Sequence, residues 1–181
     1  MPTIISHPAI AVGLAPIFQR FRVPTWLFFV GAFCTIIPDF DVIGFRLGIK
    51  YEDLLGHRGL SHSLLFAAVL SALISWGFLR HHEEISRPAC FLFLFLCTAS
   101  HGVFDALTSG GLGVAFFAPF DNSRYFFPWR PIRVSPLSLG QFLSGRGVMV
   151  LLSEIFWVWL PSFVIAIIAL TINKFAKKRC A

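Results

Sequence analysis

Two pairs of ionisable residues lie beside apolar stretches, where such side chains are costly and usually functional. His101 and Asp105 belong to the motif HGVFD, and a spacing of four places them on one face of a helix. Their imidazole nitrogen and carboxylate oxygen can therefore bind one cation together. His57 and His62 belong to HRGLSH. Gly56 before this motif and Gly59 within it favour a loop that lets His57 fold back toward the same site. Ser61 is the expected N-cap of the helix that follows this loop.

Further carboxylates and a histidine complete a candidate metal-binding set. Asp39 and Asp41 lie in PDFD directly after an apolar stretch, and His7 lies in SHPAIA near the start. Imidazole and carboxylate ligands without a thiolate suit zinc, and also manganese or iron(II), whereas calcium and magnesium prefer all-oxygen ligands. The expected ligands of one or two divalent ions are His7, Asp39, His57, His62, His101 and Asp105. Asp39 or Asp41, whichever is less used as a ligand, is the expected general base.

Each of these motifs alone has an ordinary structural explanation. His7 would serve as an interface residue, PDFD as a turn cap, HRGLSH as a solvated loop, and the pair in HGVFD as a hydrogen-bonded contact between helices. Together they place four of the six histidines at one face of an apolar protein. This coincidence favours a metal site. His81 and His82 stand apart, because they lie beside two glutamates in the opposite loop.

The composition is typical of an integral membrane protein. Hydrophobic residues make up 56% of the 181 residues and charged residues 13%, against about 45–50% and about 25% in soluble domains. These values exclude a disordered chain, a disulfide scaffold and an ordinary soluble enzyme. The net charge of +6 comes from basic residues between apolar segments, so no nucleic-acid partner is expected. The length favours a single membrane-embedded domain over residues 1–181.

The expected fold is an all-α membrane bundle with about five apolar segments. A span needs about 20 apolar residues, so the last three segments are long enough and the first two are short. The Gly-rich stretch 110–120 is expected as an interfacial loop. The segments are Ile4–Phe18, Val23–Ile37, His62–Leu79, Pro88–Leu107 and Val148–Asn173.

The distribution of positive charge predicts the orientation. Five crossings put the loops Pro38–Ser61 and Thr108–Gly147 on one face, together with all the candidate ligands. The connections on the other face hold eight of the 15 Lys and Arg residues in a much shorter length of chain. Dense positive charge marks the cytoplasmic side. The expected location is therefore a bacterial inner membrane, crossed several times, with the candidate site on the periplasmic face.

The motifs SHPAIA, PDFDVIGF, HRGLSHS, HGVFDALTSGG and RYFFPWRPI, in this order, resemble the YdjM-type inner-membrane metal-dependent hydrolases. The chain is also distantly similar to the zinc-dependent phospholipase C and nuclease superfamily. That similarity implies a first metal held by Asp39, one histidine of HRGLSH, His101 and Asp105. It implies a second metal held by His7 and Asp105. The later HxxxE helix of that superfamily is missing, so two ions are the most that the similarity supports.

The function expected from these features is that of a membrane-bound metal-dependent hydrolase, a phosphoesterase acting on a lipid or lipid-linked phosphate. Arg58, Arg124 and Arg130 are the expected substrate contacts, because a guanidinium fork matches a phosphate. As an alternative, the arginines of the long loop anchor the protein at the headgroup level. Two other functions remain open: a divalent-metal transporter, with ligands near the bilayer midplane, and a non-catalytic protein with a closed structural metal site.

Overall fold

The computed structural model describes residues 2–135, 140 and 142–179. Its regular elements are helices, and no strand occurs in the described part of the chain, which confirms the all-α prediction. Two isolated backbone bridges, Thr108 with Ile132 and Val114 with Tyr125, hold the long second loop against itself. Stretch 110–120 is a loop without helix, as expected.

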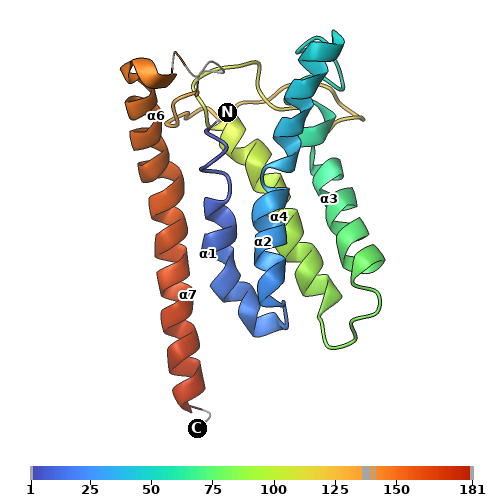
Figure 1. The fold of residues 1–181 in the computed structure, drawn as a ribbon, viewed down its shortest axis with the longest axis vertical. Helices are drawn as coiled ribbons and strands as arrows, with labels where there is room; N and C mark the ends of the chain where they lie inside the picture. Colours follow the sequence, from blue (N-terminus) through green and yellow to red (C-terminus); the bar gives the residue numbers. More distant parts are fainter. Residues whose placement is uncertain (1, 136–139, 141, 180–181) are drawn as a thin grey trace.

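The helices run roughly side by side (Figure 1). Helix α1 covers Ala9–Phe18 and passes into a 3-10 turn, and α2 covers Thr25–Cys34. A second 3-10 helix, Ile37–Leu47, continues from α2 after a short turn. The other elements are α3 (Leu64–Ala72, extended by a π turn to Phe78), α4 (Arg87–Ala106), α6 (Gly147–Glu154), a π turn (Ile155–Trp159) and α7 (Leu160–Arg179).

Helix α4 lies at the centre of the packing, against α2 and α3, while α7 packs along α1. The core between α2 and α4 contains Leu27, Phe93 and Cys97, all fully buried. Gly31 makes the close approach possible, because a Cβ at this position would lie 2.4 Å from the Phe93 ring. Apolar packing of α2 on α4 thereby sets the distance between the residues that follow α2 and the end of α4.

Three helical segments are long and apolar enough to cross a membrane: Thr25–Leu47, Arg87–Ala106 and Gly147–Ala176. The prediction that the second apolar segment is short and stops at Pro38 was wrong. Pro38 occupies the first turn of the 3-10 helix, where a missing N–H is tolerated. The helical path ends instead at Gly48, whose φ of 78° reverses the chain.

The third apolar segment is shorter than the sequence predicted. Its helical part is Leu64–Phe78, because the backbone is extended at Ser63. The N-cap is Ser63, whose hydroxyl accepts a hydrogen bond from the Phe66 N–H at 3.0 Å, and the expectation of Ser61 was wrong. Ser61 lies in the preceding 3-10 turn, and its hydroxyl donates to Asp41 instead.

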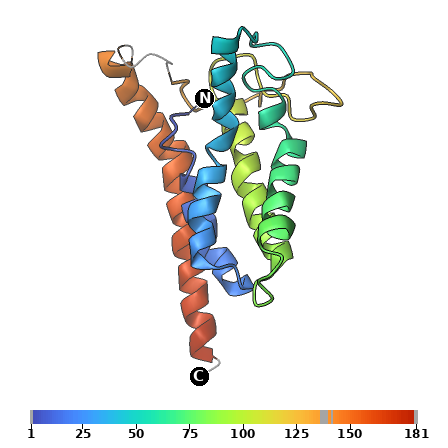
Figure 2. The ribbon, with the colours of Figure 1, turned by 45° about the vertical axis from the view of Figure 1, so that its right-hand side comes forward.

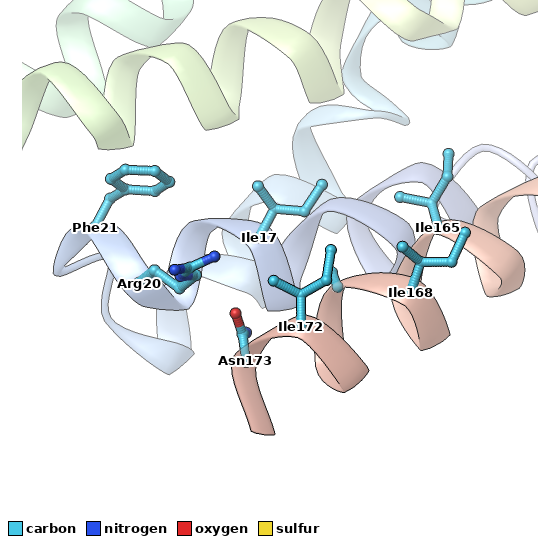
Figure 3. Close-up of a pocket in the computed structure, with 8 residues that line it drawn as sticks. Ile17, Arg20, Phe21, Ile165, Ile168, Ile172 and Asn173 are labelled. Atoms are coloured by element: carbon cyan, nitrogen blue, oxygen red, sulfur yellow. The ribbon is translucent and has the colours of Figure 1, made fainter. Parts of the chain in front are cut away.

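The two ends of the bundle differ in the way the sequence suggests. The α1–α2 turn, the α3–α4 connection and the C-terminal end of α7 lie at one end, and the N-terminal segment and both long loops lie at the other (Figures 1 and 2). Near the first end, an apolar groove of about 340 Å³ runs between α1 and α7, with Arg20 and Asn173 on its wall (Figure 3). The Asn173 amide donates to the Pro16 carbonyl at 2.7 Å and ties the two helices together.

Glu154 is a buried carboxylate inside Gly147–Ala176, the most apolar of the three candidate membrane spans. Its oxygens accept hydrogen bonds from the Thr3 N–H at 2.5 Å, the Thr3 hydroxyl at 2.6 Å and the Ser6 hydroxyl at 2.6 Å. The Trp159 indole also donates to the Ser6 hydroxyl at 3.0 Å. A buried charge is tolerated only when it is hydrogen-bonded in this way. Glu154 therefore fixes the N-terminal segment, including its neighbour His7.

Replacing Glu154 by alanine should destabilise the protein by about 3 kcal/mol, because buried donors of Thr3 and Ser6 lose their acceptor. Thermal unfolding of the purified protein in detergent should show a Tm several degrees lower. Glu52→Ala is the matched control, since Glu52 is an exposed glutamate at the loop end. Equal Tm values for the two variants would contradict the role given to Glu154.

Candidate metal centre

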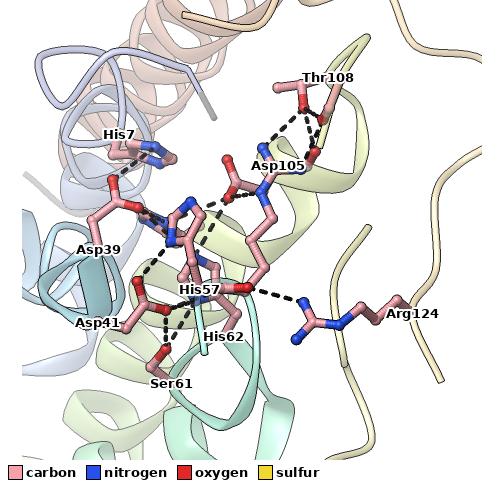
Figure 4. Close-up of polar contacts among 12 residues, drawn as sticks. His7, Asp39, Asp41, His57, Ser61, His62, Asp105, Thr108 and Arg124 are labelled. Carbon is pink, nitrogen blue, oxygen red and sulfur yellow. Dashed lines mark hydrogen bonds and ion pairs between the residues drawn. The ribbon is translucent and has the colours of Figure 1, made fainter. Parts of the chain in front are cut away.

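Four side chains that the sequence places on three separate segments converge in the structure. Asp39 comes from the 3-10 helix after α2, His62 from the turn before α3, and His101 and Asp105 from the last two turns of α4. All four are buried, and one ligand atom from each lies within 4.8 Å of the others. Figure 4 shows Asp39, His62 and Asp105 pointing toward one another.

The distances between the ligand atoms suit a single ion. His101 Nε2 lies 3.2 Å from Asp39 Oδ1, and His62 Nε2 lies 3.4 Å from Asp105 Oδ2. Two further His–Asp separations are 3.8 Å, from His62 Nε2 to Asp39 Oδ1, and 4.0 Å, from His101 Nε2 to Asp105 Oδ2. Neighbouring ligands of a tetrahedral zinc lie roughly 3.4 Å apart, given bonds of about 2.1 Å.

Each histidine of this group is oriented by a partner of its Nδ1 atom, on the side of the ring away from the centre. His101 Nδ1 lies 2.7 Å from the Thr35 carbonyl, which can only accept, so Nδ1 carries the proton and Nε2 faces the centre. His62 Nδ1 lies 3.1 Å from Asp41 Oδ2, and its Nε2 likewise faces the centre. Such partners fix the tautomer and the ring angle of metal-ligating histidines. Gly102 lets His62 come this close to α4, because a Cβ there would lie 2.9 Å from the His62 carbonyl oxygen.

Asp41 connects His62 to His57. Its Oδ1 lies 2.6 Å from His57 Nδ1, and its Oδ2 accepts from the Ser61 hydroxyl at 2.6 Å and from the Arg58 N–H at 3.1 Å. Asp41, His57 and His62 also form a second group whose ligand atoms lie within 4.8 Å of one another. The structure thus brings Asp41 and His57 beside the four-residue group, on the outer side of His62 (Figure 4).

His7 completes the set from the N-terminal segment. Its ring stacks on that of His101, with the centroids 3.8 Å apart, and its Nε2 lies 4.0 Å from Asp39 Oδ2. His7 is fully buried, yet neither ring nitrogen has a hydrogen-bond partner in the described part of the chain. Asp39 Oδ2 and His62 Nε2 also have no such partner among the described residues. Buried polar atoms are rarely left in this state, and this set of nitrogens and oxygens fits a divalent metal.

Arg58 lies inside the centre rather than at its mouth. The side chain is buried, its Nε lies 2.9 Å from Asp105 Oδ2, and its Nη atoms donate to the Gly110 carbonyl at 3.0 Å and the Thr108 hydroxyl at 3.2 Å. The guanidinium therefore neutralises part of the charge of Asp105 and holds the second loop against α4. Its predicted role as a phosphate contact stays a prediction.

The other two predicted substrate contacts lie in the second loop. Arg124 donates to the His57 carbonyl at 2.9 Å and the Tyr51 carbonyl at 2.8 Å, so it joins the two loops. Burial raises the pKa of the Tyr51 phenol, which stays protonated at neutral pH. Arg130 is exposed, with its guanidinium 4.7 Å from the centre of the Phe126 ring. Both assignments as substrate contacts remain predictions.

Sequence reasoning missed several residues that support this centre. Glu154 carried a visible signal, an acidic residue inside an apolar helix, which is rarely without a role. Thr35 acts through its backbone carbonyl and Ser61 through a tertiary contact with Asp41. Neither of these roles has a signature in residue type or spacing.

Comparison with known proteins agrees with the membrane setting and with the motifs. The inner membrane protein YbcI of Escherichia coli (strain K12) is 36% identical over 166 residues, covering 91% of this chain and 95% of the relative. No solved structure matches the chain. The family described as YdjM inner membrane protein matches residues 1–178. With almost its whole length matched, the chain belongs to the YdjM inner membrane protein family.

Proposed function

We propose that this inner membrane protein is a metal-dependent hydrolase that cleaves a phosphate ester of a lipid or lipid-linked substrate. One observation carries the proposal: Asp39, His62, His101 and Asp105 present ligand atoms to a common point inside an apolar bundle. Carboxylates at such a depth are expensive unless a cation or a buried partner compensates them. The group also lies at the loop end of α4 rather than in the middle of that helix.

In this proposal the four residues hold the first ion, and zinc suits their donors best. His7 is the additional ligand for a second ion. The distant similarity to the phospholipase C and nuclease superfamily pairs it with Asp105, whereas in the structure its Nε2 lies 4.0 Å from Asp39 Oδ2. When bound, a divalent metal supplies Lewis-acid chemistry, since it acidifies water and polarises a phosphoryl oxygen.

The residues around the ligands supply positioning and proton transfer. Both oxygens of Asp41 already accept hydrogen bonds, which favours a role in orienting His57 and His62 over a role as the base itself. Asp41 polarises His57 through Nδ1, and the Nε2 atom of the same ring is then available to take a proton. Asp41, His57 and His62 would alternatively hold the second ion. Metal stoichiometry distinguishes these two uses.

A structural metal is the second candidate, because four protein ligands can close a tetrahedral site. The complete burial of His101 and Asp105 favours this reading. A transporter fits less well, since transport sites lie near the midplane on broken helices. Here the ligands of α4 come from its final two turns, and the helix is unbroken.

We also propose that the chain crosses the membrane several times and that the metal centre faces the periplasm. The dense positive charge of the short connections supports this orientation, because such charge stays in the cytoplasm. Both long loops, the N-terminal segment and the candidate centre lie at the opposite end of the bundle (Figure 2).

The first prediction concerns the metal itself. Purified wild-type protein should contain about one or two zinc ions per chain by elemental mass spectrometry, and His101→Ala should retain less than about a tenth of this. Asp105→Ala should give the same loss, and Asp121→Ala is the control because Asp121 lies in the exposed loop. Membrane insertion should be unchanged in all three. Equal metal content in wild type and both ligand variants would contradict the site.

The second prediction separates catalysis from a structural metal. His57→Ala should keep the ion held by the four-residue group but reduce hydrolysis of a lipid phosphate in detergent by about 10²-fold or more. Chelation should abolish the same activity. If chelation lowers the Tm by several degrees and wild type hydrolyses no lipid phosphate, the metal is structural. A loss of one ion per chain in His57→Ala would instead assign His57 as a ligand.

The third prediction tests the orientation. A reporter fused after Ala181 should be cytoplasmic, and one inserted at Asn122 in the second loop should be periplasmic. Paired alkaline phosphatase and fluorescent protein fusions measure this, because each is active on one side only. A cytoplasmic signal at Asn122 would place the metal centre on the inside.

A further inference from the structure

A pocket of about 450 Å³ lies beside the start of α6, at the loop end of the bundle. Its described lining comes from the second loop, at Ser109, Arg133 and Val134, and from the beginning of the last helix, at Arg146 and Met149. The pocket is therefore built by segments that are separate in the sequence. None of its residues belongs to the candidate metal centre.

The charged side chains in the described lining of this pocket are positive. Arg133 and Arg146 both line it, and no acidic side chain is among its described residues. Neither guanidinium takes part in an ion pair or side-chain hydrogen bond with another described residue, although the Arg133 backbone N–H donates to Ser153. Both arginines are exposed residues in the lining of one pocket, and an anion bound between them would reduce the repulsion of their charges. Their planar forks match the oxygens of a phosphate.

The rest of the pocket indicates an amphiphilic ligand. Val134, Met149 and Val150 form an apolar wall beside the two arginines. The most apolar of the candidate membrane spans, Gly147–Ala176, begins at this point, so the pocket lies where that helix leaves the membrane. Lipid phosphates lie at the ends of membrane spans, on both faces, and a guanidinium fork beside an apolar wall suits an anionic headgroup.

The pocket is linked to the metal centre through the segment around Ser109. Ser109 lines the pocket, while its neighbours Thr108 and Gly110 accept hydrogen bonds from Arg58, which in turn pairs with Asp105. A lipid held in the pocket is thus anchored next to the segment that carries the candidate ligands. By contrast, Arg124 is engaged by loop carbonyls, and the apolar groove of Figure 3 has a single arginine in its lining.

We propose that the pocket at Arg133 and Arg146 binds the phosphate of an anionic membrane lipid. Its role as an anchor for the substrate rests on the proposed hydrolase function, whereas the binding itself does not. The occupant is a lipid rather than a free anion, because the apolar wall is continuous with the membrane-spanning helix and suits the glycerol and acyl region.

The test uses the full chain purified in detergent, with phosphatidylglycerol as the probe and native mass spectrometry as the readout. The double variant Arg133→Gln, Arg146→Gln should bind phosphatidylglycerol roughly tenfold more weakly than wild type. The control is Arg46→Gln, Lys50→Gln, which removes the same charge from exposed positions of the other loop. It should bind as wild type does, and phosphatidylcholine should bind weakly to all three proteins.

Equal binding by the double variant and wild type would overturn the proposal, as would an equal loss in the control variant, which would indicate attraction by net charge alone. Displacement of the lipid by inorganic phosphate at equal concentration would also overturn it, since the pocket would then select a free anion. Metal content measured on the same samples separates this result from the hydrolase. A double variant that keeps its metal but loses the lipid supports the pocket even if no hydrolysis is found.

Discussion

Two carboxylates buried in an apolar bundle impose the constraint that organises this protein. Asp39 and Asp105 are 4% and 0% exposed, and an isolated buried carboxylate costs several kcal/mol. Three imidazoles and the Arg58 guanidinium surround them, each from a different segment or turn. The loops at this end of the bundle follow from that requirement. Arg58 reaches Asp105 only because the chain around HRGLSH folds back over α4.

A third buried carboxylate, that of Glu154, fixes the position of the N-terminal segment. Glu154 in the last helix binds Thr3 and Ser6, and the next residue, His7, is thereby pressed against His101. The packing of α1 along α7 supports the same arrangement. Glu154 in an apolar helix thus positions His7 beside a centre that is built mainly by α4. Hydrogen bonds of Glu154, which are strong in surroundings of low dielectric constant, hold the N-terminal segment, and His7 of that segment contacts the centre by stacking on His101.

The sequence predicts which of these side chains lie close together better than it predicts the boundaries of the helices. The i, i+4 spacing of His101 and Asp105 is local, so it held in the structure, and the convergence of Asp39 and His62 followed from where their segments end. The prediction that the second apolar segment ends at Pro38 failed because a proline is also compatible with the first turn of a 3-10 helix. The prediction of the N-cap failed because Ser61 and Ser63 are the same residue type. Only the tertiary contact of Ser61 with Asp41 distinguishes it from Ser63, which caps the helix. The contact of the Arg58 side chain with Asp105 depends on tertiary packing, which residue spacing does not encode. The same holds for the position of Arg133 and Arg146 in the lining of one pocket.

The support behind the ligands bears on what the centre does with an ion. A transported ion must leave its site again, so at least some ligands have to move between two arrangements. Here His101 is held by the Thr35 carbonyl, His62 by Asp41, and Asp105 by Arg58, each from a different direction. Moving any of these ligands would break a buried hydrogen bond or ion pair, which costs more in an apolar interior than in water. This rigid support favours an ion that stays in place. An ion held in this way beside the Asp41–His57 pair would suit the proposed hydrolase better than a transporter.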